Sequence, residues 1–264
     1  MKQNSLFAIF RFTLLEVLRT RLWLFAVLVV ALAYGVAYFA SSLAITESND
    51  YKIITFATLA RLLAVFIVCL FISNSVIRDF DDGVFELMIS RPVSKLNWYV
   101  ARISAFFALV VGFASLCALP LLFLGAPHLI IWWSGLVGEL LILASVTMAF
   151  AITLKNSTIV VTAVLSFYVL SRLISALVLM SARAAADIAQ PLNNLVAEIV
   201  EGISYFLPDL SRFADSSVLI ASTELYTGVN PSLESHLIFV IAQCMLYCLL
   251  LSAIGLFDLY RRNF

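Results

Sequence analysis

The sequence has few charged residues. Only 12% of its 264 residues are Asp, Glu, Lys or Arg, which is about half the ~25% that is typical of a soluble domain. This composition argues against a soluble fold. The 16 basic and 16 acidic residues give a formal net charge of zero, and the balance argues against a nucleic-acid-binding protein, which needs a basic surface.

Histidine and cysteine are scarce too, and this limits the chemistry that the chain can perform. It has two histidines, with no His-x-x-x-His motif and no cluster of His with carboxylates, so a membrane-embedded enzyme acting on lipid is disfavoured. The four cysteines all lie in apolar runs, which argues against disulfides and zinc. Cys244, Met245 and Cys248 share a helical face that is compatible with a soft metal, but packing is the better interpretation and we expect no metal site.

A nucleotide-binding site is also missing. No G-x-x-x-x-G-K-[ST] phosphate loop occurs in the sequence, and no polar stretch is long enough to form a nucleotide-binding domain. We therefore expect no catalytic residues and no cofactor in this chain.

Apolar residues make up 63% of the chain. They are collected into runs near or above the ~20 residues with which a helix crosses the hydrocarbon core. We therefore predict an all-α polytopic membrane protein with one transmembrane domain over residues 1–264. The six predicted spans cover residues 22–46, 53–77, 103–125, 129–154, 157–180 and 236–257.

Two further segments are predicted to lie outside the hydrocarbon. Residues 1–21 combine basic residues with apolar ones three and four apart, which indicates an amphipathic helix at the membrane interface. Residues 181–235 mix polar and apolar residues with Pro191, Pro208 and Pro231 between them. That pattern indicates short amphipathic helices.

Basic residues predict the orientation, because loops rich in Lys and Arg stay in the cytosol. Most of the 16 basic residues fall on one side when the N-terminus is placed inside. We thus predict a protein of the bacterial inner membrane with both termini cytosolic and residues 181–235 external. Trp98, Trp132 and Trp133 are expected as interface anchors.

Three ionisable residues lie within predicted spans, where a charge is costly unless it faces a partner or a cavity. Glu139 and Arg172 each lie roughly 12–15 Å from the outer ends of their spans, at 1.5 Å per residue, and Arg61 is similarly placed. We predict that all three meet. Two interpretations stay open: a structural ion pair of Glu139 with Arg172 or Arg61, and a polar spot in a transport path that contacts an anionic or zwitterionic substrate.

The segment 78–102 is the longest charged stretch between spans in the first half of the chain. Asp81 and Asp82 favour a helix N-terminus. Phe85, Met88 and Ile89 follow on one face, and a proline ends the pattern. It predicts a short cytosolic helix over residues 81–90, for which an ordinary helix covering the membrane surface is the plain interpretation.

This stretch resembles the signature region of ABC-2 type permeases, the membrane subunits of ATP-binding-cassette transporters. The residues that carry the resemblance are Asp81, Asp82, Gly83, Glu86, Leu87, Met88, Arg91, Pro92, Val93 and Ser94. The resemblance extends over the chain, through the N-terminal amphipathic helix, the six spans and a Leu-Pro-Asp stretch at 207–209. In organisation the chain is similar to the permease subgroup of nitrous-oxide-reductase maturation systems.

The resemblance implies a coupling helix that docks on a separate cytosolic ATPase. The residues expected to couple to it are Asp81, Asp82, Gly83, Phe85, Glu86, Met88, Ile89 and Arg91. It also implies two permease copies and two ATPase copies, with ATP and Mg bound by the ATPase. A different class of function stays open, a membrane anchor whose external segment 181–235 binds a partner. The substrate is left open, because the family handles lipids, polysaccharides, drugs and peptides.

Overall fold

The structure is a computed structural model that describes residues 2–43, 48–84, 94–187, 191–213, 215–220 and 233–261. Within these ranges all regular structure is helical and no strand occurs. The elements in chain order are α1 (Lys2–Arg19), α2 (Leu22–Ser42), α3 (Ser48–Asp81), α5 (Lys95–Phe123), α6 (Leu129–Leu154), α7 (Ser157–Asp187), α8 (Pro191–Phe206), the 3-10 helices η1 (Leu210–Arg212) and η2 (Ser216–Leu219), and α10 (Leu233–Arg261). The predicted all-α fold is confirmed.

Six of these helices, α2, α3, α5, α6, α7 and α10, are long and apolar enough to cross a membrane. Their most apolar windows have mean hydropathies of 2.0 to 2.5. They coincide with the six predicted spans. The sequence could locate them because each span depends mainly on the length and polarity of one continuous run.

The helix ends near the charged segment differ from the prediction. α3 continues to Asp81 and α5 begins at Lys95, so both ends of the predicted cytosolic segment 78–102 belong to long helices. Ser94 caps α5, since its Oγ accepts a hydrogen bond from the Asn97 amide at 3.2 Å. At the other end of α5, Pro120 lies inside the helix and the chain turns at Gly125, whose φ is +67°.

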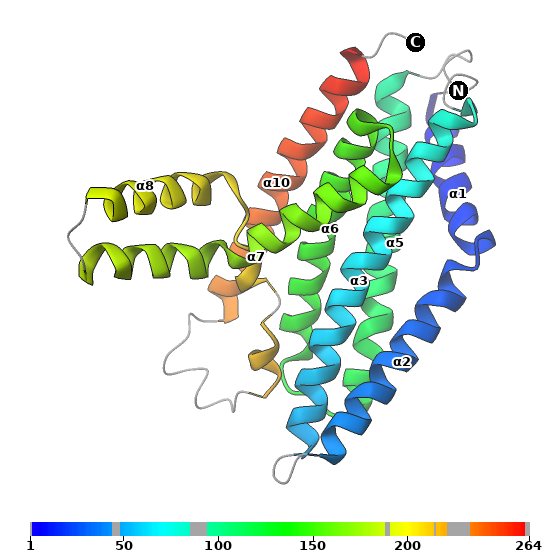
Figure 1. Cartoon of the computed structure of the whole chain (residues 1–264). Coiled ribbons are helices and arrows are strands. Elements are labelled where there is room, and N and C mark those ends of the chain that lie inside the picture. Colours follow the sequence, from blue (N-terminus) through cyan, green and yellow to red (C-terminus); the bar gives the residue numbers. More distant parts are fainter. Residues whose placement is uncertain are drawn as a thin grey trace.

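α6 is the central helix of the bundle (Figure 1). In its most apolar window 83% of the residues are buried, against 28% for α2, 22% for α7 and 17% for α10. α6 packs on α3, α5, α7 and α10. The outward faces of α2, α7 and α10 therefore remain available for lipid or for another protein.

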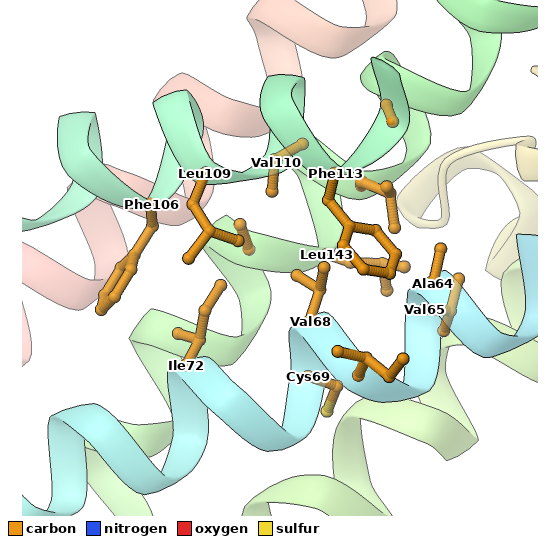
Figure 2. Close-up of a cluster of buried hydrophobic side chains, with 14 of the residues drawn as sticks. Ala64, Val65, Val68, Cys69, Ile72, Phe106, Leu109, Val110, Phe113 and Leu143 are labelled. Atoms are coloured by element: carbon orange, nitrogen blue, oxygen red, sulfur yellow. The ribbon is translucent and has the colours of Figure 1, made fainter. Parts of the chain in front are cut away.

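The packing between α3 and α5 forms the middle of the apolar core (Figure 2). Val68 and Ile72 of α3, one turn apart, point toward Leu109 and Phe106 of α5, and Leu143 of α6 lies beside them. The Phe106 ring also meets Phe71 edge-on at 6.4 Å between centroids. Because lipid is as apolar as these side chains, close van der Waals packing holds the helices together here.

The predicted N-terminal amphipathic helix is present as α1. Ile9, Thr13 and Val17 recur every four residues on its buried face, and the helix packs on α5. Phe7 and Phe12 are exposed on the other side.

The short helices expected within 181–235 are also present, as α8, η1 and η2. α8 packs on α7, and the α7–α8 hairpin extends sideways from the bundle (Figure 1).

Close packing between α6 and α10 makes Gly255 a test of the fold. A Cβ at Gly255 would lie 2.8 Å from the Tyr99 hydroxyl and 3.3 Å from the Ala149 backbone. We expect Gly255→Val to destabilise the protein by about 1–3 kcal/mol, the usual range for overpacking, measured as a lower thermal midpoint in detergent. Gly35→Val is the matched control, because a Cβ added at Gly35 would have nothing within 4 Å. Equal midpoints for the two variants would contradict this packing.

Candidate functional site

The predicted coupling helix does not begin at Asp81. Asp81 forms the last residue of α3, and the chain then turns at Gly83, which has φ +67°. The Gly83 amide donates to the Phe80 carbonyl at 3.3 Å. A glycine in this conformation commonly ends a helix, and it outweighed the preference of the two acids for a helix start. The other coupling residues, Phe85, Glu86, Met88, Ile89 and Arg91, lie outside the described residues.

Next to the end of α3, a buried arginine joins three helices. Arg102 of α5 is only 1% exposed. Its Nη2 lies 2.8 Å from Asp79 Oδ2 on α3, and its Nη1 lies 3.0 Å from Glu16 Oε2 on α1. It also donates to Ser75 Oγ at 2.6 Å and to Thr13 Oγ1 at 2.9 Å. One guanidinium therefore holds α1, α3 and α5 together.

Glu16 is the second centre of this cluster. Its carboxylate accepts hydrogen bonds from Ser75 at 2.9 Å, from Arg102 and from Arg78. We call Glu16, Ser75, Arg78, Asp79 and Arg102 the α1-end network. The network contains two acids and two arginines, so its charges cancel. This pairing offsets the cost of burying most of these charged groups.

The α1-end network is not predictable from the sequence pattern. Arg78 and Arg102 fall at the two ends of the predicted cytosolic segment, and no motif distinguishes Glu16. One signal was present in the sequence: Glu16 is the only acidic residue of the otherwise basic α1. It did not identify partners that lie 59 to 86 residues away along the chain.

The three predicted intramembrane charges do come together. Glu139 of α6 is fully buried, and its Oε1 lies 3.4 Å from Arg172 Nη1 of α7 while its Oε2 lies 3.7 Å from Arg61 Nε of α3. Arg61 is 2% exposed and Arg172 is 31% exposed. We call these residues the intramembrane triad. Glu139 precedes Lys155 by 16 residues and Arg172 follows Asn156 by 16 residues, so the short turn between α6 and α7 brings them to one depth.

The intramembrane triad has hydrogen-bonding capacity beyond its ion pairs. Arg61 Nη2 donates to Ser216 Oγ of η2 at 3.5 Å. Tyr168 and Ser171, one turn or less before Arg172, are buried beside the triad. Arg61 Nε faces Glu139 Oε2 in the ion pair, and within the described residues the Ser171 hydroxyl has no hydrogen-bond partner. Buried polar groups are normally satisfied, so the Ser171 hydroxyl could pair with a further polar group at this site.

Cys244 and Cys248 of α10 lie close together. Cys244 Sγ lies 3.9 Å from Cys248 Sγ and 3.8 Å from the Gly138 carbonyl oxygen. Among the residues described here, no three or more His, Cys, Asp or Glu side chains are grouped to hold a metal ion. The interface-anchor prediction is wrong for Trp98 and Trp132, each 1% exposed. Trp98 packs against the Phe80 ring instead.

The fold defines a multi-pass helical membrane protein, and two ionic clusters lie at different depths of its helix bundle. No family model matches the chain, and no curated protein matches it.

Proposed function

We propose that the chain is the permease subunit of an ABC-2 type transporter that uses ATP hydrolysed by a separate ATPase. The observation that carries the proposal is the sequence motif between Asp81 and Ser94, which begins at the last residue of α3, the longest of the described helices. The α1-end network lies beside the end of that helix and supports the same function, because it links this position to α1 and α5.

The proposed mechanism follows from the connections of α3. Residues 82–94 connect α3 to α5, so a partner that pushes on this segment moves both helices. Arg102 bonds to Asp79 of α3 and to Glu16 of α1, and therefore transmits the movement to α1. Arg61 lies on α3 as well, 17 residues before Arg78, or about 26 Å along the helix. α3 therefore connects the proposed ATPase contact to the intramembrane triad.

The proposed assembly contains two permease copies and two ATPase copies, with ATP and Mg on the ATPase. The exposed faces of α2, α7 and α10 supply surface for the second copy and for the bilayer. In the proposed orientation the α1 end faces the cytosol of a bacterial cell and the intramembrane triad lies in the outer half of the membrane. The output is export or force transmitted to a partner outside the membrane.

The anchor function keeps one supporting observation. Exposed apolar side chains of α8, among them Leu195, Val196 and Ile199, lie on the α7–α8 hairpin that extends from the bundle (Figure 1). Binding of a partner protein to this hairpin would not require an ATPase. A variant of the coupling segment that loses the ATPase but still binds such a partner would show that the two functions are separate.

Purification of the tagged chain from its native membranes tests the proposal. We expect a small soluble ABC ATPase to co-purify in about equal amount. Phe85→Asp and Glu86→Arg are each expected to lower the amount of co-purified ATPase by about tenfold or more, because a charge change within an interface is costly. Glu198→Arg on the exposed side of α8 is the control and should retain it. An ATPase that stays bound in both coupling variants would refute the coupling segment.

A further inference from the structure

A pocket lies between α3 and the elbow that joins α1 to α2. Its volume is about 220 Å³, which is smaller than the ~300–1,000 Å³ of typical small-molecule sites. Its lining residues are Glu16, Thr20, Phe25, Ile67, Leu70, Phe71, Asn74, Ser75 and Arg78. A space of this size suits one stretch of hydrocarbon chain better than a whole compact ligand.

The polarity of the pocket changes along α3. Ile67, Leu70 and Phe71 line one end, and Asn74 and Arg78 line the other. Ile67 and Arg78 are 11 residues apart, or about 16 Å, close to half of the ~30 Å hydrocarbon core. The lining residues of α3 therefore cover about the height of one leaflet and change from apolar to polar along it, with the polar end at the α1 end of the bundle.

The charges at the polar end favour an anion. Arg78 is 52% exposed. Arg19 and Arg21, which flank the lining residue Thr20, are exposed as well. Glu16, the one acid among the lining residues, is only 8% exposed and already accepts hydrogen bonds from two arginines and a serine. Asp81 and Asp82 are exposed beyond the pocket, three and four residues after Arg78. The exposed charges at this end are therefore three arginines against two aspartates, and basic residues near a membrane surface attract anionic lipid.

We propose that this pocket binds one acyl chain of an anionic phospholipid from the cytosolic leaflet, with the headgroup beside Arg78. This lipid site is separate from the proposed transport function. It shares with that function only the assumption that the α1 end of the bundle faces the cytosol. A lipid held here contacts Glu16 and Arg78 of the α1-end network, so it braces the elbow against α3.

Native mass spectrometry of the purified full chain tests the site. The probes are phosphatidylglycerol and phosphatidylcholine with the same acyl chains, added after delipidation. We expect one phosphatidylglycerol to be retained about fivefold more strongly, the order of one favourable arginine. Leu70→Trp, which fills the apolar end, should abolish retention of both lipids. Leu63→Trp is the matched control, because Leu63 is a half-buried leucine on the same helix outside the pocket.

Two further variants keep the test decisive. Phe25→Trp narrows the pocket from α2 at an exposed position, so it should lower retention even if Leu70→Trp does not fold. Arg78→Gln should remove the preference for phosphatidylglycerol and leave acyl-chain retention. Three results would each overturn the proposal. They are unchanged lipid retention in both Leu70→Trp and Phe25→Trp, equal retention of the two lipids by the original chain, and retention of inorganic phosphate as strong as that of phosphatidylglycerol. Because no ATPase enters this assay, failure of the transport proposal leaves its result unaffected.

Discussion

Glu139→Gln is expected to destabilise the folded chain by about 3–5 kcal/mol, the usual cost of removing one partner from a buried ionic group. The carboxylate of Glu139 is fully buried and pairs with both Arg172 and Arg61. A neutral amide leaves Arg61 charged at 2% exposure without its counter-ion. The measurement is the unfolding midpoint in detergent, with Glu198→Gln on exposed α8 as the control.

A triple replacement separates the two interpretations of the intramembrane triad. Arg61→Met, Glu139→Leu and Arg172→Met together remove every charge of the triad, and such apolar substitutions are often neutral or stabilising. Under the proposed function, a triad that is only structural predicts a triple variant that folds and keeps ATP-driven activity. If the triad contacts a substrate, the triple variant folds but loses activity. A Glu139→Gln protein as stable and as active as the original would contradict both interpretations.

Arg102→Ala is expected to cost about 3–5 kcal/mol and to loosen α1 from the bundle. The substitution leaves Glu16 and Asp79 without their shared guanidinium, although each is only 8% exposed. Hydrogen exchange should show faster exchange in α1, while α6 at the centre of the bundle stays protected. Under the proposed function, the variant should also uncouple ATP hydrolysis from transport, because the connection of α3 to α1 is lost.

Two variants control this experiment. Arg19→Ala removes an exposed charge from the same end of α1 and should leave exchange unchanged. Arg102→Lys keeps the charge but loses the planar fork that reaches two carboxylates, so we expect an intermediate effect. If α1 stayed as protected in Arg102→Ala as in the original chain, the α1-end network would not hold that helix.

Part of the candidate site could be predicted because it depends on local spacing. Glu139 and Arg172 lie at equal distances from a very short turn, and two helices joined by such a turn place those positions at one depth. Depth alone did not identify Ser216, which approaches Arg61 from a segment 155 residues away. That contact depends on how η2 folds back on α3.

The sequence by itself determined that this chain forms six membrane-spanning helices with an amphipathic N-terminal helix, because run length and charge decide where each helix lies. It also carries the motif on which the proposed ATPase contact rests. Only the tertiary structure decided that α6 is central, that Trp98 and Trp132 are buried, that Glu16 and Arg102 meet 86 residues apart, and that a pocket opens beside them. Hydropathy indicates which helices can cross the membrane, but the packing of side chains from distant segments decides which face of one helix contacts another.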